Sequence, residues 1–358
     1  MAEFIFKTEP YDHQREAFTA SAERVNFALL MDMGTGKTKV DIDSMALCYE
    51  KGIIDFAIIV APKGVIRNWV PEIATHLPDR IEREIVVWKP SLTKTNRKEL
   101  MDLYEHTGKM KFLLMNIEAF STKKGVDVAE FFVQKFKVFM TVDESTTIKN
   151  RQAKRTKAIC SVGRGAVMRR ILTGSPVTKS PMDLYSQMAF LSPDLLGFKS
   201  YYAFQGRYAV VQRRTMGPRS FNQILGFQKL DELTSKLDEH SFRVRKEDCL
   251  DLPDKVYMRR EVELTSEQTE AYVQMKHLAL ARLDSGDLST TQNVLTQIMR
   301  LQQICLGSLT DDDGIVHPLK SNRQAALLDI CDEIQGKALI WATWTRDIRS
   351  IAEALRDR

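Results

Sequence analysis

Residues 31–38, with the sequence MDMGTGKT, have the residue types and spacing of a phosphate-binding loop. Glycines let main-chain N–H groups approach phosphate oxygens, and the N-terminus of a following helix adds its dipole to that attraction. A lysine then reaches the terminal phosphates and a hydroxyl helps to hold Mg²⁺. The general pattern has glycine where this chain has Met31, and an ordinary strand-to-helix turn is the alternative interpretation. The predicted contacts to phosphate and magnesium are Gly34, Thr35, Gly36, Lys37 and Thr38.

Two adjacent acids, Asp143 and Glu144, follow the apolar run 137–142. Carboxylates at the end of a buried strand are costly unless a cation or substrate uses them. Asp143 fits a magnesium ligand, acting through the ion or its water. Glu144 fits the base that orients and deprotonates the attacking water. A solvated Asp-Glu pair opening a loop is the alternative, and the phosphate loop upstream favours catalysis.

Gln14 lies upstream of the phosphate loop, in a segment where Tyr11, Gln14 and Phe18 share one helical face. Its amide can both donate to and accept from an adenine edge. The alternative is a surface glutamine on an amphipathic helix.

The elements that must position these residues are short apolar runs separated by helix-prone, charged runs. This alternation predicts βαβ units and a parallel, doubly wound sheet. Ligands of such sheets bind at the carboxyl ends of the strands, where we expect the loop and the acids to meet. The hydroxyl-rich turn 173–176 is expected to hydrogen-bond the acidic turn. The expected strands are 26–31, 55–61, 85–88, 111–115, 137–142 and one beginning at 171, and the expected helices are 10–18, 39–49 and 93–105.

The composition is that of a globular protein of two or three domains, with 358 residues and a net charge of +5. This charge is compatible with a polyanionic partner but does not establish one. The five cysteines form no CxxC pair and predict free thiols in a reducing compartment, the cytoplasm or a nucleus. The charged N-terminus does not resemble a signal peptide, and no apolar run is long enough to span a membrane.

The order of the motifs is more specific than any one of them. Gln14, GTGKT, IVAPKGVIRNW, DEST with IKN, and LTGSPVTKSPMDLYSQMAFLSP together resemble superfamily-two ATPases, and among these the Swi/Snf-type DNA translocases. Downstream, FRVRKEDCLDLPDK, VELTSEQTEAY, LQQICLG and KALIWATWT resemble later landmarks of that family, so the resemblance spans residues 10–355. Thr146 stands where the family usually has histidine, and Ser175 replaces a threonine.

The resemblance implies a RecA-like ATP-binding domain over 1–190, a mainly helical insertion and linker region over 191–336, and the start of a second RecA-like domain over 337–358. It implies ATP and Mg²⁺ as cofactors, with Gln14 on the adenine and Lys37, Asp143 and Glu144 as catalytic residues. It also implies double-stranded DNA as a partner, held mainly by its phosphate backbone. The implied DNA contacts are Lys63, Asn68, Trp69, Asn116, Lys149 and Asn150, of which Trp69 has core packing as its alternative role.

A second lobe with a Gly-rich motif and an arginine motif is further implied. Of it we expect one strand over 338–342 and one helix over 346–355, so turnover should need that lobe in cis or in trans. The leading function is an ATP-dependent translocase on double-stranded DNA. The alternatives are a strand-separating DNA or RNA helicase and a nucleotide-dependent DNA-binding module without turnover of its own.

The region 198–214 alternates aromatic and basic residues. It predicts either a helical protrusion that grips duplex backbone or a helical hairpin with an aromatic core. TMGPR at 215–219 predicts a turn, and 309–316 predicts a hairpin turn, since it lacks the spacing of a calcium loop.

Overall fold

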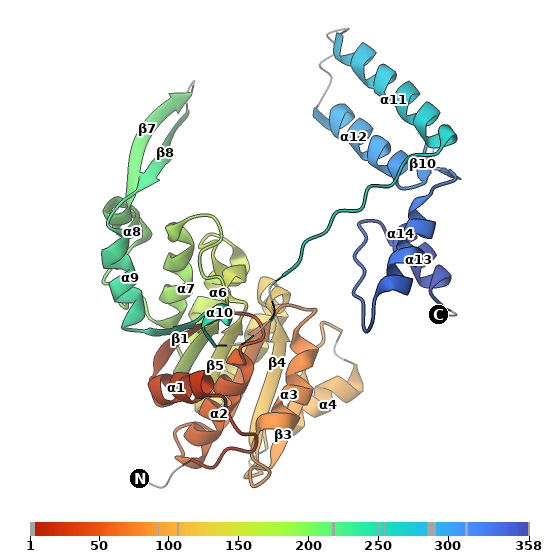
Figure 1. Ribbon diagram of the computed structural model, residues 1–358. Coiled ribbons are helices and arrows are strands. Elements are labelled where there is room, and N and C mark those ends of the chain that lie inside the picture. The colour runs from red at the N-terminus through yellow and green to blue at the C-terminus, as the bar shows by residue number, and fades with distance from the viewer. Residues whose placement is uncertain are drawn as a thin grey trace. The chain divides into compact units, whose positions relative to one another are not determined.

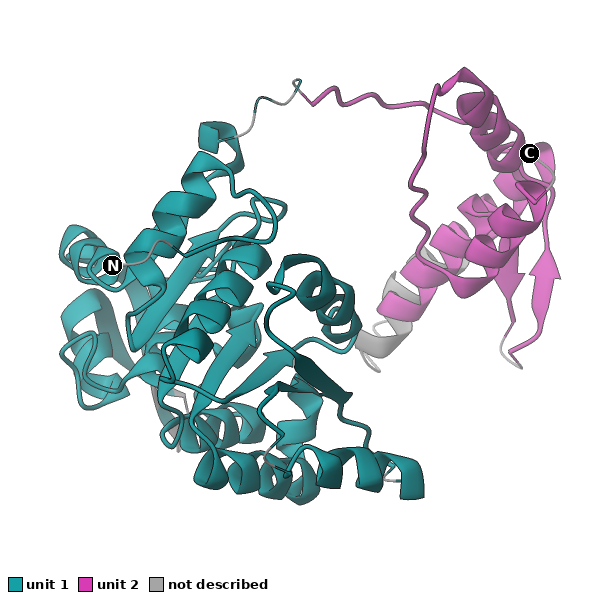
Figure 2. Cartoon of the chain, turned by 90° about the horizontal axis from the view of Figure 1, so that it is seen from below, with its two compact units in different colours: residues 1–253 teal, residues 254–358 magenta. Residues whose placement is uncertain are grey.

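The computed structural model describes residues 4–356 apart from 92, 106, 217–218, 250, 252, 254, 285–290 and 312–313. The chain forms two compact units, residues 1–253 and 254–358 (Figure 2). Among the described residues, no helix combines the length and apolar character needed to cross a membrane.

The first unit is built on a seven-stranded sheet in which every strand pair is parallel, in the order β3-β4-β2-β5-β6-β1-β9. The predicted parallel α/β fold is therefore confirmed. The strands are β1 (Asn26–Met31), β2 (Phe56–Ala61), β3 (Arg83–Val87), β4 (Met110–Asn116), β5 (Val138–Asp143), β6 (Met168–Leu172) and β9 (Ser241–Val244).

Helices cover both faces of this sheet (Figure 1). Strand β2 shows why, because all six of its residues are buried and they alternate between two hydrophobic cores. Phe56, Ile58 and Val60 belong to one core, and the residues between them belong to the other. The first core includes residues of α4 (Lys94–Asp102), α5 (Lys123–Lys135), α6 (Lys154–Gly163) and α7 (Leu184–Leu191). The second includes residues of α1 (Asp12–Ser21), α2 (Lys37–Glu50) and α3 (Trp69–His76).

The expected domain boundary at residue 190 is not where the structure divides the chain. Residues 191–253 stay with the first unit, because β9 pairs with β1 and completes the sheet. The elements between β6 and β9 are, besides α7, the helices α8 (Tyr201–Tyr208) and α9 (Leu230–Asp238) and the strands β7 (Ala209–Met216) and β8 (Arg219–Phe227). Helix α10 (Lys246–Cys249) follows β9.

The region predicted to be a helical protrusion or hairpin contains only one helix, α8, before it continues into the antiparallel ribbon β7–β8. The ribbon projects beyond α8 and α9, away from the sheet (Figure 1). Two aromatic residues of α8 do form a core: Phe204 and Tyr208 are fully buried, with ring centroids 5.0 Å apart. β-branched residues such as Val210 and Val211 favour a strand over a second helix. The predicted turn at 215–219 joins the two strands, and its residues 217–218 lie outside the described part.

The second unit contains α11 (Ser266–Asp284), α12 (Thr291–Cys305), the antiparallel pair β10 (Ser308–Thr310) and β11 (Val316–Pro318), α13 (Arg323–Glu333) and α14 (Thr345–Ala354). The pair β10–β11 confirms the hairpin predicted at 309–316. The helix expected at 346–355 is observed as α14. The strand expected at 338–342 is not formed, and Leu339 and Trp341 are exposed. A strand needs a neighbour to satisfy its backbone, and this segment pairs with none in the described residues.

Candidate active site

The phosphate loop follows β1 in a conformation that requires glycine. Gly34 and Gly36 have φ values of +85° and +88°, in the left-handed region. Lys37 is the first residue of α2, and its Nζ lies 3.4 Å from Oε1 of Glu144. The structure therefore brings the predicted phosphate lysine and the predicted base together.

Gln14 lies directly against this loop. A Cβ added to Gly36 would lie 2.2 Å from Gln14 Nε2, so a side chain at position 36 would displace the Gln14 amide. Gln14 Nε2 donates to the main-chain oxygen of Thr35 at 3.1 Å, and Gln14 Oε1 accepts from the N–H of Tyr11 at 3.1 Å. Its role as an adenine contact stays a prediction, and what the geometry adds is that Gln14 braces the loop. Nε2 of His13, which sequence reasoning missed, lies 2.8 Å from the same Thr35 oxygen. Because that oxygen can only accept, this histidine nitrogen carries the hydrogen.

Both oxygens of the Asp143 carboxylate accept hydrogen bonds. Oδ1 accepts from the N–H of Glu144 at 2.9 Å, and Oδ2 accepts from Nε1 of Trp69 at 3.1 Å. Burial raises the pKa of Asp143, while the Trp69 hydrogen bond and the Lys37 charge act in the opposite direction. A buried carboxylate of this kind would be stabilised by a cation.

Glu144 itself has φ 48° and ψ 56°, a left-handed conformation that is unfavourable for a residue other than glycine. Such conformations cost about 1–3 kcal/mol and gather at functional sites. Here the strain turns the chain sharply after β5, and the Glu144 carboxylate lies within ion-pair distance of Lys37.

The residues present fit a magnesium ion. Mg²⁺ typically uses one or two protein ligands and completes its shell with phosphate oxygens and water. Asp143 and the hydroxyl of Thr38 would supply those ligands. The described residues contain no group of three or more His, Cys, Asp or Glu that could form an all-protein metal cage.

The hydroxyl-rich turn after β6 contacts the acidic turn by a different route from the one expected. Thr173 Oγ1 accepts locally, from the N–H of Ser175 at 3.2 Å. The connection runs through Gln187 of α7, which accepts from Ser145 Oγ at 2.7 Å and donates to the main-chain oxygen of Pro176 at 2.7 Å. A long amide spans this gap, whereas the short hydroxyls of the turn do not.

Close packing also joins this turn to the phosphate loop. A Cβ on Gly174 would lie 3.1 Å from the Cα of Asp32 and 3.3 Å from the oxygen of Met31. Strand β6 lies between β5 and β1 in the sheet, so its turn lies beside both the acidic turn and the phosphate loop.

The start of α10, directly after strand β9, adds a residue to the site that sequence reasoning missed, Lys246. The N–H of Asp32 donates to the oxygen of Val244 at 3.1 Å, and Oδ2 of Asp32 accepts from the N–H of Lys246 at 3.0 Å. These two bonds clamp the end of β9 to the phosphate loop. The Lys246 ammonium lies beside Gly34, where a Cβ would be 3.4 Å from its Nζ. The only local signal is its charge, because β9 is distant in sequence.

The predicted DNA contacts, except Trp69, follow three neighbouring strands. Lys63 and Asn68 come after β2, Asn116 ends β4, and Lys149 and Asn150 come after β5. Lys63, Asn68 and Asn150 are exposed, and the other two are half-buried. Since the strands are parallel, all five lie at the edge of the sheet that carries the phosphate loop.

Trp69 does not belong to that set. Its side chain is 1% exposed and packs in the core, which is the alternative role, and its contact with DNA stays a prediction. A large aromatic ring gains most from burial, and its one polar group is satisfied by Asp143.

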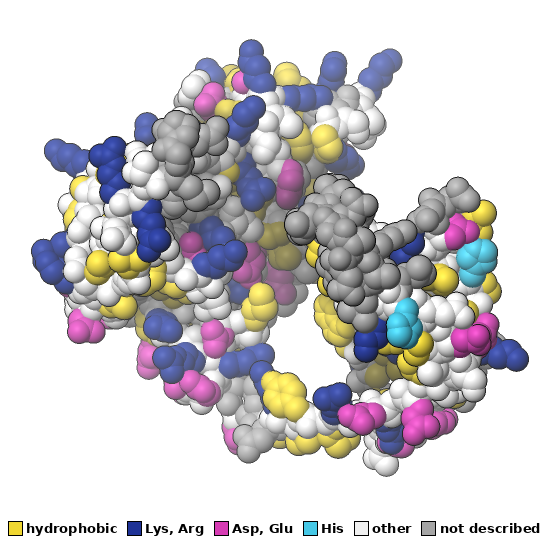
Figure 3. Space-filling model, turned by 90° about the horizontal axis from the view of Figure 1, so that it is seen from above, with side chains coloured by type: hydrophobic (Ala, Val, Ile, Leu, Met, Phe, Trp, Pro, Cys, Tyr) yellow, Lys and Arg dark blue, Asp and Glu magenta, His cyan; other side chains and the backbone are white. Residues whose placement is uncertain are grey.

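Charge does not clearly mark the edge that is predicted to face DNA. Figure 3 shows Lys and Arg side chains spread over one face of the protein with Asp and Glu among them. The assignment of this edge therefore rests on strand ends and on the family motifs.

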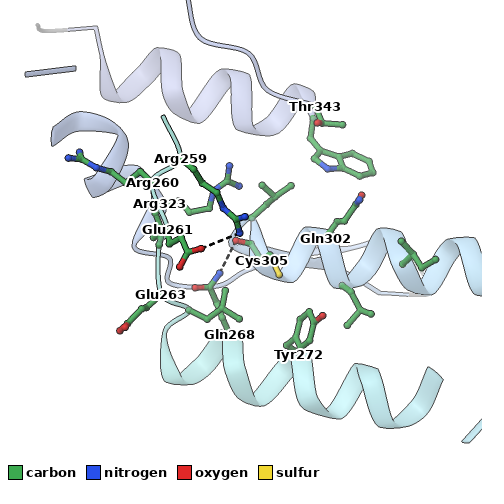
Figure 4. A pocket seen from close by; sticks show the side chains of 16 residues that line it. Arg259, Arg260, Glu261, Glu263, Gln268, Tyr272, Gln302, Cys305, Arg323 and Thr343 are labelled. Carbon is green, nitrogen blue, oxygen red and sulfur yellow. Dashed lines mark hydrogen bonds and ion pairs between the residues drawn. The ribbon is translucent and has the colours of Figure 1, made fainter. Parts of the chain in front are cut away.

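A hollow of about 1080 Å³ lies in the second unit, and none of the predicted site residues lines it (Figure 4). Its lining carries both charges, including an Arg259–Glu261 ion pair at 3.2 Å. Gln268 Nε2 donates to the main-chain oxygen of Ile304 at 2.7 Å on the same wall. With a mixed-charge lining and no strand end or glycine loop, it does not have the features of the predicted nucleotide site.

Comparison with known proteins agrees with this geometry. An ATP-dependent helicase of Mycoplasma genitalium is 26% identical over 305 residues, covering 84% of this chain and 26% of its own length. A probable ATP-dependent DNA helicase of Arabidopsis thaliana is 31% identical over 183 residues, covering 51% of this chain and 15% of its own. A chromatin-remodeling ATPase of Neurospora crassa is 27% identical over 293 residues, covering 78% of this chain and 14% of its own length. The chain thus spans about a quarter or less of the length of these relatives.

Among solved structures, the Sulfolobus solfataricus SWI2/SNF2 ATPase core in complex with double-stranded DNA is similar, with a TM-score of 0.54 and 21% identity. The match covers 100% of this chain and 72% of that one, and at this identity it shows the fold alone. The model of the SNF2-related domain matches residues 13–308. The chain therefore belongs to the SNF2-related domain family, as its motifs indicated.

Proposed function

We propose that this chain is the ATP-binding part of an SNF2-type motor that moves along double-stranded DNA. The observation that carries the proposal is the 3.4 Å approach of Lys37 to Glu144, which joins the phosphate loop to the acidic turn at one edge of the sheet. Relatives named as ATP-dependent helicases and remodeling ATPases support the use of ATP.

Each residue of the site has a distinct task in this proposal. The main chain of 34–38 and Lys37 bind the phosphates, and arrival of the γ-phosphate draws Lys37 away from Glu144. Glu144, released from that ion pair, orients the attacking water and accepts its proton. Gln14 contacts the adenine. Bound magnesium would neutralise charge on the β- and γ-phosphates, held by Asp143 and Thr38.

The DNA partner is proposed to lie along the carboxyl ends of β4, β2 and β5. Lysine and asparagine side chains there suit phosphate oxygens, so binding should depend on salt and little on sequence. The DNA complex named for the Sulfolobus core supports this choice.

Turnover is proposed to need a second RecA-like lobe, supplied in cis or in trans. An arginine that stabilises the transferred phosphoryl group contributes about 10³–10⁵ in rate in phosphoryl-transfer enzymes. Phosphate release should therefore stay low for residues 1–358 with duplex DNA and rise when the lobe is added. Robust Glu144-dependent turnover by residues 1–358 alone would contradict this part of the proposal.

Nucleotide binding tests the ATP site directly. Lys37→Ala should weaken binding of an ATP analogue, because it removes the charge opposite the terminal phosphates. Glu144→Gln should leave binding nearly intact and abolish the turnover that is measured with the second lobe added. Lys51→Ala, at the far end of the same helix, is the matched control and should change neither. Wild-type turnover by Glu144→Gln would refute the assignment of the base.

Salt dependence tests the DNA edge. Combining Lys63→Ala with Lys149→Ala should reduce the slope of log affinity against log salt by about two. Lys135→Ala with Lys137→Ala removes the same charge beside the amino end of β5 and serves as the control. An equal effect of both pairs would place the DNA elsewhere.

Strand separation is the second candidate, because two relatives are named as helicases. Displacement of a triplex strand without unwinding of a forked duplex supports translocation, and unwinding of the fork supports the helicase. Nucleotide-dependent DNA binding without turnover, even with the second lobe present, supports a binding module.

A further inference from the structure

The turn between β2 and α3 is a compact element held by its own backbone. The N–H groups of Val65 and Ile66 donate to the oxygen of Pro62 at 2.9 and 3.0 Å. The N–H of Asn68 donates to the oxygen of Val65 at 2.9 Å, inside the 3-10 helix η1 (Ile66–Asn68). Trp69 follows immediately as the first residue of α3. A turn bonded in this way shifts as one piece when either of its faces is pulled.

This turn has two faces of opposite character. Lys63, Arg67 and Asn68 are exposed, whereas Ile66 and Trp69 are buried. The structure gives no ion-pair partner to Lys63 or Arg67 among the residues that it describes. The exposed face is thus open to an anion, and Arg67 extends the face that the sequence predicted from Lys63 and Asn68.

The buried face holds the acid predicted to bind magnesium. Trp69 Nε1 donates to Asp143 Oδ2 at 3.1 Å, and the backbone of Glu144 occupies the other oxygen. The indole N–H can only donate, and in this dry environment no water replaces it at low cost. These two donors fix the rotation of the carboxylate, while each oxygen keeps a second lone pair for a ligand.

We propose that Trp69 is a positioning residue that holds Asp143 in its metal-binding orientation and links DNA on the Lys63–Asn68 face to the affinity for magnesium nucleotide. This rests on the proposed function. DNA phosphates that pull on the exposed face move the indole with it, and the carboxylate follows its donor. By linkage, DNA and magnesium nucleotide then change each other's affinity by the same factor.

Trp69→Phe tests this, because it keeps a ring in the core and removes only the donor. Trp88→Phe is the matched control, since Trp88 is also buried and its Nε1 has no hydrogen-bond partner among the described residues. Binding of a non-hydrolysable ATP analogue is measured with magnesium and with EDTA, each with and without a blunt mixed-sequence duplex. Trp69→Phe should reduce the gain from magnesium by about tenfold, the worth of a hydrogen bond to a charged group. The same variant should bring the DNA factor, which is the ratio of the affinities for the ATP analogue with and without duplex, close to one. Its affinity for the analogue in EDTA should be unchanged, and Trp88→Phe should behave as wild type.

The outcomes separate this inference from the function on which it rests. Absence of magnesium-dependent nucleotide binding in the wild type would overturn the proposed function. If Trp69→Phe keeps the wild-type gain in analogue affinity from magnesium and the wild-type DNA factor, the role of Trp69 is overturned and the proposed function is not. If Trp69→Phe lowers the affinity for the ATP analogue in EDTA, a variant with benzothienylalanine at position 69 is used in place of Trp69→Phe. In that side chain, sulfur takes the place of the N–H in a ring of the same shape. The same two values decide the question in that variant.

Discussion

Asp41 gives the sharpest stability prediction, because it is an acid on the buried side of the helix that follows the phosphate loop. It lies on α2 with no exposed surface, and its Oδ2 accepts from Thr141 Oγ1 at 2.7 Å. Its Oδ1 has no hydrogen-bond partner among the described residues. Burial raises the pKa of Asp41 to about 7, against the lowering effects of the Thr141 hydrogen bond and the Arg170 charge.

The sign of the effect follows from this direction. In the unfolded chain the carboxyl titrates near 3.8, so between 3.8 and about 7 the folded protein holds a proton that the unfolded chain has lost. Stability from this group therefore falls as pH rises through that window and is constant above it. At about 1.4 kcal/mol per pH unit, the loss between pH 5 and pH 8 is about 2–3 kcal/mol.

Asp41→Asn is neutral at every pH and keeps an acceptor for Thr141. The variant should therefore gain about 2–3 kcal/mol of unfolding free energy relative to wild type between pH 5 and pH 8. Urea denaturation measures this in a Trp341→Phe, Trp344→Phe background, where fluorescence comes from Trp69 and Trp88 in the first unit. A difference that is constant with pH would refute the reasoning. It would mean that the Arg170 charge outweighs burial and keeps Asp41 ionised throughout.

Two further predictions concern the phosphate loop. Lys246→Gln should weaken binding of an ATP analogue by roughly twofold to fivefold, as expected for an exposed, screened charge. Arg243→Gln, on strand β9 just before Lys246, should not weaken it; equal effects would mean that only net charge matters. Gly174→Ala should destabilise the first unit by about 1–3 kcal/mol through overpacking against Asp32 and should lower nucleotide affinity. Gly206→Ala is the control, because a Cβ there meets open space in helix α8, and it should be neutral or stabilising in the same urea assay. An unchanged stability of Gly174→Ala would show that the contact between position 174 and Asp32 relaxes freely.

The motifs located the central strands well because local sequence decides them. Strand β1 was expected at 26–31 and lies there, and the other predicted strands differ by one to three residues at their ends. Continuous apolar runs and the glycines of the phosphate loop are strong local signals. The same signals placed Lys37, Asp143 and Glu144 at one edge of the sheet.

What sequence reasoning missed depends on contacts between distant segments. The run SFRV of β9 is short and half polar, and its identity as a strand comes only from pairing with β1. The apolar run at 338–342 looked like a strand, but it has no neighbour to pair with in the described residues. Trp69 and Gln187 likewise take their roles from partners more than 40 residues away, Asp143 and Ser145.

The late position of β9 has a consequence for synthesis on the ribosome. Until residues 241–244 emerge, β1, which leads into the phosphate loop, is the edge of the sheet and exposes a row of unpaired backbone groups. The phosphate loop also lacks its clamp at Asp32 until Lys246 has been made. The chain between β6 and β9 leaves the sheet and returns to the same sheet, with the ribbon β7–β8 at its far end. Changes in the length or sequence of that ribbon can therefore accumulate during evolution without moving the phosphate loop or the acidic turn, provided that β9 still returns to cover β1.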